Sequence, residues 1–571
     1  MTAAEMHRGP APSGRKGRMR LRRLPHPYAT AFLVAVAALV LVPLGSLIAY
    51  AVQGDRELWP HLSTYVLPHA AFNTAMLLAG VALICATIGA GTAWLVTAYD
   101  FPGRNALVWL LPLPLSFPTY IVAYVYVDLL DGFGPVQTAL RALSGWQSAG
   151  DYWFPNVRSL GGAIMLMSVV LYPYVFLATR AMFQTQSPSL IEMARGLGAG
   201  KWRLVWDITL PLARPAIAAG LALAMLEALN DIGASEYLGV QTLTLSIFNT
   251  WLNRSSLPGA AQIACVMLLA VAGLIALERY GRRGQGYAGL DARPGVERVA
   301  LAGGSGWLAT AACFVPVTLG FLVPLAFLIY QVATRGLLAG FDPTLIRHTL
   351  GTILIATVAM LLILALGFGA ALALRYARRS FTELCFLIAG LGYAVPGTVL
   401  ALGLLSPMVA VDEAINAVVR LFGGSGVGLL LAGSSAAVVC AYVIRFLAIA
   451  TGFAQAGLAR ISTDMDDAAR AVGTRPVGMV WSIHLPLMRP ALWGAALLIF
   501  VDCLKELPAT LLLRPMNVET LATYIYQFAT RGDFEEGALA ALLIVLVGIV
   551  PVIRMVRHAD EALIAGLGRM R

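Results

Sequence analysis

The sequence predicts an all-α polytopic membrane protein with about 12 transmembrane helices, arranged as two parallel six-helix repeats. Three observations support this fold class: 59% of the 571 residues are hydrophobic, only 12% are charged, and long apolar stretches recur along the whole chain. A stretch of about 20 apolar residues can cross a hydrocarbon layer of about 30 Å. Because lipid offers no hydrogen-bond partners to the backbone, such stretches should be helices.

The predicted spans and the charges beside them set the orientation of the chain. The spans cover residues 29–52, 73–98, 105–128, 161–182, 213–235, 259–278, 304–332, 349–374, 381–409, 426–450, 490–512 and 537–556. A basic tail precedes the first span, and most of the 40 Lys and Arg residues fall on the side of that tail. The positive-inside rule therefore predicts a multi-pass protein of the bacterial inner membrane, with cytoplasmic N- and C-termini. The net charge of +10 reflects this topology and does not indicate nucleic-acid binding.

The chain also repeats itself, and the repeat divides it into halves. Residues 187–215 read SPSLIEMARGLGAGKWRLVWDITLPLARP, and residues 462–490 read STDMDDAARAVGTRPVGMVWSIHLPLMRP, at an offset of 275 without a gap. A second set of matches, at an offset of 278, pairs Thr74 with Thr352, Gly89 with Gly367 and Pro118 with Pro396. Six is an even number, so both halves should enter the membrane in the same direction.

The predicted domains follow from the repeat. They are a cytoplasmic basic tail (1–28), a first transmembrane half (29–285), a cytoplasmic linker (286–300) and a second transmembrane half (301–571). Prolines inside the third span of each half, at Pro118 and Pro396, are expected to kink or break those helices.

Each repeated segment lies in an inner loop between the fourth and fifth spans of its half. Ser187 and Ser462 suit helix N-caps, and Gly198 and Gly473 suit left-handed turns after a short first helix. A second helical stretch follows and is expected to end at the proline of the Leu-Pro pair, at Pro211 or Pro486. The product is a helix–turn–helix that projects from the membrane at two pseudo-symmetric places.

These segments resemble the EAA loop, the signature of permease subunits in binding-protein-dependent ABC importers, whose pattern is E-A-A-x3-G-x9-I-x-L-P. Met193 and Asp467 are mild departures from that pattern. We refer to 187–215 and 462–490 as the first and second EAA loops. The resemblance implies that the loops couple the chain to an ATPase. The coupling residues it implies are Glu192, Ala194, Gly198, Pro211, Asp467, Ala469, Gly473 and Pro486.

The resemblance also implies the partners of the chain. They are two copies of an ABC ATPase subunit, a periplasmic substrate-binding protein and membrane lipid, with no nucleic acid. Gly200-Lys201 is not a phosphate-binding loop, because Arg195 and Trp202 stand where that motif needs glycine and Ser or Thr. We therefore expect a transport subunit that is not an enzyme and binds no cofactor, with ATP and Mg on the partner ATPase.

Charged residues inside apolar helices are costly and usually functional. The fifth span of each half carries two acids four residues apart, which predicts that each pair shares one helix face. We expect these residues to line a translocation path or a gate; the alternatives are acids that reach water at a helix end, or an ion pair of Lys505 with a neighbouring acid. The candidate path residues are Glu227, Asp231, Asp502, Lys505 and Glu506.

The sequence around the acids resembles a narrower family, the fused ferric iron importer permeases. KELPATLLLRP at 505–515 and NDIGASEYLGVQTLTLSIFNTW at 230–251 carry this resemblance. It implies that ferric iron, delivered by a periplasmic binding protein, is the cargo. Related fused permeases for thiamine or aminoalkylphosphonate share the layout and remain alternatives. Metal ligands are not identified, since the oxygen-bearing candidates outside the spans are scattered: Tyr152, Glu236, Tyr237 and Asp533.

Two other functional classes are weaker. A twelve-helix secondary transporter also shows parallel halves, but it gives no reason for paired EAA loops. A membrane enzyme needs a cluster of catalytic or metal-binding groups, and the seven histidines form none in the sequence. The loop 129–160 is long enough to contact a binding protein, although its aromatic residues also suit an ordinary interfacial belt.

Overall fold

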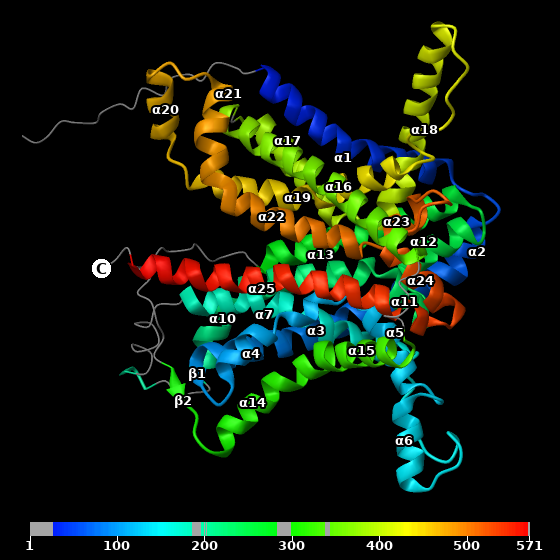
Figure 1. The fold of residues 1–571 in the computed structure, drawn as a ribbon, viewed down its shortest axis with the longest axis vertical. Coiled ribbons are helices and arrows are strands. Elements are labelled where there is room, and N and C mark those ends of the chain that lie inside the picture. The colour runs from blue at the N-terminus through cyan, green and yellow to red at the C-terminus, as the bar shows by residue number, and fades with distance from the viewer. Residues whose placement is uncertain are drawn as a thin grey trace, which may run out of the picture.

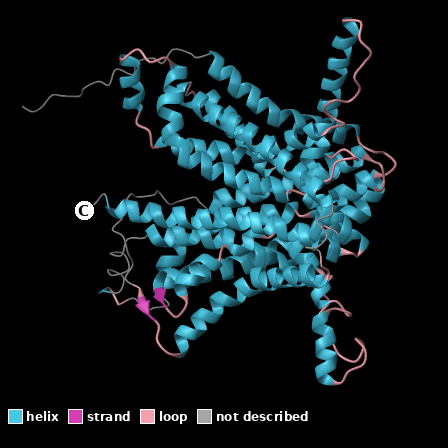
Figure 2. Cartoon of the chain, in the orientation of Figure 1, coloured by secondary structure: helices cyan, strands magenta, loops and turns pink. Residues whose placement is uncertain are grey.

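The computed structural model describes residues 27–185, 196–198, 200, 203–281, 298–336, 343–377 and 379–568. Almost all of these residues are helical, as Figure 2 shows. In this part of the chain, eleven helices are long and apolar enough to cross a membrane, or twelve when a bent pair is counted as one span. The predicted fold class is therefore confirmed.

The two halves contain similar successions of helices. The first half comprises α1 (Pro27–Gln53), α2 (Trp59–His61), η1 (Leu62–Val66), α3 (Leu67–Ala98), α4 (Arg104–Leu110), η2 (Leu113–Ser116), α5 (Thr119–Leu130), α6 (Pro135–Ser144), α7 (Leu160–Thr185), η3 (Leu204–Thr209), α10 (Leu210–Asn230), α11 (Ile232–Tyr237), α12 (Leu243–Leu252) and α13 (Leu257–Gly281). The second half comprises α14 (Gly304–Val317), η4 (Thr318–Leu322), α15 (Val323–Thr334), α16 (Pro343–Tyr376), α17 (Ser380–Ala389), η5 (Gly390–Ala394), α18 (Gly397–Leu421), α19 (Ser435–Ala459), α20 (Thr463–Ala471), α21 (Pro476–Met479), η6 (Val480–His484), α22 (Leu485–Lys505), α23 (Pro508–Leu513), α24 (Leu521–Arg531), η7 (Phe534–Gly537) and α25 (Ala538–Gly568). Two short strands, β1 (Tyr99–Asp100) directly after α3 and β2 (Val299–Ala300) shortly before α14, pair in parallel.

The third span of each half is broken at its proline, as expected. In the first half, the span predicted over 105–128 consists of two segments, Arg104–Ser116 and Thr119–Ser144, that meet at 93°. Pro118 lacks an amide hydrogen and lies in an extended conformation, so a new helix begins directly after it. In the second half, α18 likewise begins directly after Pro396.

The fifth span of each half is also broken, and this break was not predicted. α10 ends before Asp231 and α22 ends before Glu506, and both acids have extended backbone angles. Each acid accepts amide hydrogens from the next helix: Asp231 Oδ1 lies 2.8 Å from Ala234 N, and Glu506 Oε1 lies 3.0 Å from Ala509 N. A carboxylate that caps a new helix competes with continuation of the old one. The prediction that the acids of each pair share one helix face is therefore wrong.

The second helix of each EAA loop does not end at its proline. Instead, η3 and η6 are single π-helical turns that pass directly into α10 and α22, with Pro211 and Pro486 in the first turn of those helices. Local π-helical geometry lets a membrane helix continue past a proline, which lacks an amide hydrogen. One continuous helix thus runs over Val477–Lys505, and another over Trp206–Asn230.

Equivalent packing contacts explain why Gly89 and Gly367 match at an offset of 278 residues. A Cβ atom on Gly89 would stand 2.7 Å from Val175 Cβ, and one on Gly367 would stand 2.4 Å from Ala450 Cβ. These glycines therefore allow α3 to approach α7 and α16 to approach α19 closely.

Equivalent hydrogen bonds explain the other matched pair. The hydroxyl of Thr74 accepts from Leu243 N at 3.0 Å, and the hydroxyl of Thr352 accepts from Leu521 N at 2.9 Å. In each half, a threonine on the second span thus holds the start of a short helix, α12 or α24.

The first helix of each half packs against the other half. α1 lies beside α16, α17 and α18, and α14 and α15 lie beside α3, α4 and α5 (Figure 1). Gly403 of α18 allows close contact with Pro43 of α1, and Gly320 does the same with Val169 of α7. Tyr126 of α5 donates a hydrogen bond to the carbonyl of Leu319, at 2.6 Å.

Candidate functional site: EAA loops and a charged cavity

The two candidate regions lie at different depths of the molecule. The helices of the second EAA loop, α20 and α21, lie at the same end as the C-terminal end of α25, whereas α6 and the end of α18 project at the opposite end (Figure 1). The acids of the fifth spans line a cavity beside the helix breaks. Two long continuous helices connect these regions.

The second EAA loop has the predicted helix–turn–helix form. The hydroxyl of Ser462 caps α20 by accepting from Asp464 N at 3.0 Å, and Gly473 adopts a left-handed φ of +84°. Asp467 is exposed and Ala469 is half-buried. Val472 is 86% exposed, so an apolar side chain stands on a surface rimmed by charge. Such a surface is typical of a protein–protein contact.

The first EAA loop is described only in part. Glu192 and Ala194, together with the expected N-cap Ser187, lie outside the described residues. Gly198 has the same left-handed φ of +84° as Gly473, and the preceding Leu197 is 89% exposed. The turn glycine therefore has the same φ in both halves.

Arg375, at the end of α16, fastens the second EAA loop to the membrane bundle. Its guanidinium donates to Asp466 Oδ2 at 2.7 Å and to the carbonyls of Leu458 and Ile461 at 2.7 and 3.1 Å. The Nε2 atom of His484 lies 2.9 Å from the other oxygen of Asp466. The sequence did not indicate this role, because a basic residue in the last turn of a helix is common.

The charge state of Asp466 follows from these contacts. Burial alone would raise the pKa of this carboxyl group, but the hydrogen bonds from Arg375 and His484 and their charge outweigh burial. The pKa therefore lies below the ordinary value of 3.8. The carboxylate is ionised at neutral pH and keeps Arg375 in place.

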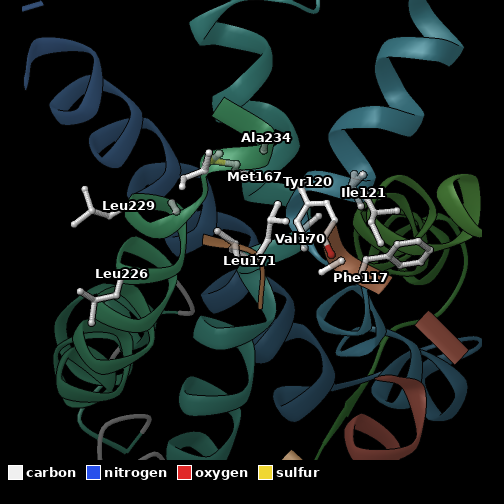
Figure 3. Close-up of a cluster of buried hydrophobic side chains, with 14 of the residues drawn as sticks. Phe117, Tyr120, Ile121, Met167, Val170, Leu171, Leu226, Leu229 and Ala234 are labelled. Atoms are coloured by element: carbon white, nitrogen blue, oxygen red, sulfur yellow. The ribbon is translucent and has the colours of Figure 1, made fainter. Parts of the chain in front are cut away.

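A cavity of about 80 Å³ lies where the broken spans of both halves meet. This volume can hold a few water molecules or one small ion. Figure 3 shows part of its apolar wall, with Phe117, Tyr120, Val170 and Leu171 close together. All five path residues proposed from the sequence line this one cavity: Glu227, Asp231, Asp502, Lys505 and Glu506.

The acids of the second half are held in ion pairs. Lys505 Nζ lies 2.9 Å from Asp502 Oδ1, which is the pair considered as an alternative from the sequence. Glu506 Oε1 instead lies 3.4 Å from a guanidinium nitrogen of Arg445, a residue of α19 that the sequence analysis missed. Arg445 is 6% exposed and lies inside an apolar span, and that intramembrane charge was the signal available in the sequence.

The acids of the first half have no such partners. In the described part of the chain, neither Glu227 nor Asp231 forms an ion pair. Glu227 accepts a hydrogen bond from the hydroxyl of Tyr393 at 3.0 Å. Asp231 accepts from the hydroxyl of Thr119 as well as from Ala234 N. The cavity therefore carries four acids and two basic residues, an excess of two carboxyl groups.

The described residues contain no group of three or more His, Cys, Asp or Glu side chains placed to hold a metal ion. Three of the oxygen-bearing residues outside the predicted spans bond to three different partners. Tyr152 bonds to Gln137 at 2.6 Å, and Tyr237 bonds to Asp128 at 3.4 Å. Glu236 bonds to Tyr526 at 2.5 Å.

Comparison with known proteins identifies the class. Residues 86–283 and 363–564 each match the family described as "Binding-protein-dependent transport system inner membrane component". These matches cover more than half of the chain, so the protein belongs to this family of ABC transport permeases. It is accordingly a multi-pass protein of an inner-membrane transport system. Such a permease is not itself an enzyme and works with ATPase and periplasmic binding-protein partners.

Two relatives align with most of this chain, and a third aligns with less than half of it. The chain is 25% identical to the "Fe(3+)-transport system permease protein FbpB 2" of Haemophilus influenzae, over 85% of this chain and 89% of that protein. It is also 25% identical to the "Probable ABC transporter permease protein y4fN" of Sinorhizobium fredii, over 84% and 85%. The "Sulfate transport system permease protein CysT" of Escherichia coli is 28% identical and aligns over 93% of its length with 45% of this chain. The last match is consistent with a permease unit that occurs twice here.

Proposed function

We propose that this chain imports ferric iron, released by a periplasmic binding protein, through the cavity between its two halves. The single observation that carries the cargo assignment is the uninterrupted KELPATLLLRP stretch at 505–515, which places Lys505 and Glu506 in the cavity wall. The excess of two carboxyl groups in that wall favours a cation over an anion such as sulfate.

The position of the EAA loops indicates which end of the molecule faces the cytoplasm. We place α20, α21 and both termini in the cytoplasm, in agreement with the distribution of basic residues. The opposite end, with α6 and the end of α18, then faces the periplasm, where the binding protein docks. The chain binds no cofactor of its own and no nucleic acid, and lipid surrounds its apolar outer surface.

We propose that two ATPase subunits, which bind ATP and Mg, dock one under each EAA loop. The helix over Val477–Lys505 supports this role because it is continuous from the loop to the cavity wall. At 1.5 Å per residue, its 29 residues span about 44 Å. A displacement of the loop thus reaches Asp502 and Lys505 along a single helix.

Substitution of the turn glycines tests the coupling role. Gly198→Val and Gly473→Val place a β-branched side chain at a φ of +84°, which costs about 1–2 kcal/mol locally. Within the described residues, a Cβ atom at either position meets nothing within 4 Å, so the rest of the fold should persist. We expect both variants to lose co-purification with the ATPase and uptake of iron. Gly532→Val is the matched control, because Gly532 has the same φ of +84° and open surroundings.

Uptake itself tests the cargo. The experiment reconstitutes the permease with its ATPase and binding protein in liposomes and supplies ⁵⁵Fe(III) on the binding protein. We expect ATP-dependent accumulation of iron that neither thiamine nor an aminoalkylphosphonate reduces. Uptake of thiamine or of a phosphonate in place of iron would overturn the cargo assignment, and uptake without ATP would favour a secondary transporter.

A further inference from the structure

We infer that Glu227, together with Tyr120 and Asn230, contacts the passing cation. In the second half, the acids at the equivalent positions are instead paired with Lys505 and Arg445. The inference rests on the proposed transport of ferric iron and goes beyond it, because it assigns the contact to one half of the chain. The cavity is built from symmetry-related positions that carry different chemistry in the two halves.

The asymmetry appears when each position is compared with its counterpart 275 residues later. The cavity-lining pairs are Glu227 with Asp502, Asn230 with Lys505, Asp231 with Glu506, and Val170 with Arg445. The acids are present in both halves. Both basic residues belong to the second half, and neutral residues stand in their places in the first half.

Three of the four acids already have a role that satisfies their charge or their oxygens. Asp502 pairs with Lys505, and Glu506 pairs with Arg445 and caps α23. Asp231 caps α11 and accepts from Thr119. Glu227 caps no helix, and within the described residues its hydrogen-bond partner is the neutral hydroxyl of Tyr393. It is therefore the carboxylate of this cavity that a cation can approach without displacing a cap or an ion pair.

Two buried polar atoms give an independent indication of a ligand. The side-chain oxygen of Asn230 and the hydroxyl of Tyr120 both line the cavity, and each residue is 4% exposed. Within the described residues, neither atom has a hydrogen-bond partner. Buried polar atoms are nearly always partnered by protein, water or ligand, so these two atoms are placed for something that enters the cavity. Figure 3 shows Tyr120 beside Val170, at the start of α5.

The chemistry of these groups suits a hard cation in transit. Carboxylate, amide and phenol oxygens are the ligands that such cations prefer. The described residues do not form a ready-made metal cage, and a pathway site must bind weakly enough to release its ion. We therefore assign Glu227, Asn230 and Tyr120 as transient contacts to an iron(III) ion that keeps part of its own water shell.

Substitutions on the first half test the assignment in the reconstituted complex. Glu227→Gln removes the charge but keeps the shape, and we expect at least a tenfold loss of ⁵⁵Fe(III) uptake. Asn230→Lys gives the first half the basic residue of the second, three residues after the acid as in Asp502 and Lys505. We expect it to block uptake to a similar extent by pairing with Glu227. Glu227→Asp should retain at least a third of the wild-type rate.

The controls separate a transport defect from misfolding. Asp100→Asn, which changes an exposed acid in β1 outside the cavity wall, is the matched control and should transport at the wild-type rate. The yield of assembled complex and its ATPase activity should be unchanged in Asn230→Lys and Glu227→Asp. Wild-type uptake that survives both Glu227→Gln and Asn230→Lys within twofold would overturn the assignment. A wild-type complex that takes up no iron would instead overturn the proposed cargo, so the two failures are distinguishable.

Discussion

The ammonium group of Lys505 lies 2.9 Å from the carboxylate of Asp502, one turn earlier on α22, while the counterpart of this lysine in the first half is Asn230. The side chains of the pair are 22% and 11% exposed, inside a membrane-spanning helix. Two halves with the same fold thus place different charges at one cavity. The halves of the cavity are therefore not chemically interchangeable.

The pair makes a prediction about stability. Lys505→Met leaves Asp502 buried without its cation, and breaking a buried ion pair in this way costs about 3–5 kcal/mol. We expect a clear drop in the melting temperature of the detergent-solubilised protein. The double variant Asp502→Asn with Lys505→Met should recover most of that loss, because position 502 then carries no charge that needs a partner. Additive losses in the double variant would contradict the pairing.

Arg375 predicts a coupling defect without loss of the membrane fold. Arg375→Met removes the hydrogen bonds to Asp466 and to the carbonyls at the base of the second EAA loop. We expect the protein to assemble in the membrane but to bind the ATPase at least tenfold more weakly, measured by titration of the purified ATPase. Arg460→Met changes an exposed arginine beside the same loop and should bind normally. Equal binding by both variants would show that Arg375 does not position the loop.

Asp466 predicts how this attachment depends on pH. Its folded-state pKa lies below 3.8, so its stabilising effect is present above that value and is lost as the pH falls through the lower folded pKa. The melting temperature of wild type should therefore remain above that of Asp466→Asn from roughly pH 5 to 8. The difference should shrink only in more acidic solution. A difference that disappears already near neutral pH would mean that another group controls the attachment.

Gly367 predicts a packing defect. A Cβ atom at this position would stand 2.4 Å from Ala450 Cβ, so Gly367→Val must push α16 away from α19. Overpacking of this kind costs about 1–3 kcal/mol, which should lower the melting temperature. Gly351→Val, on the same helix, is the control, because a Cβ atom at Gly351 meets nothing within 4 Å in the described part of the chain. Equal melting temperatures for the two variants would argue against the close approach.

The sequence alone predicted the class of fold and the positions of the EAA loops, because both depend on local patterns. Apolar length indicates membrane spans, and two ungapped repeats at an offset of 275 outweigh any single short motif. The matched Gly89 and Gly367 were visible as an echo, but their contact with α7 and α19 was not. Contacts between distant segments leave no pattern of their own in one sequence.

The breaks at Asp231 and Glu506 were missed for a physical reason. A long apolar run with an acid near its end looks like one helix, and only the carboxylate's contact with the following amides shows that a second helix starts there. Arg445 was missed in a similar way. Its partner Glu506 lies 61 residues away in sequence, so spacing along one helix cannot reveal the pair.

The crossing of α1 and of α14 with α15 has a consequence for how the transporter can move. The first helix of each half packs against the other half. The two bodies that move against each other are therefore not the two halves defined by the sequence repeat. Each moving body must contain most of one half together with the first helix of the other half. Because both halves belong to one polypeptide, every molecule contains both of these exchanged first helices in equal number.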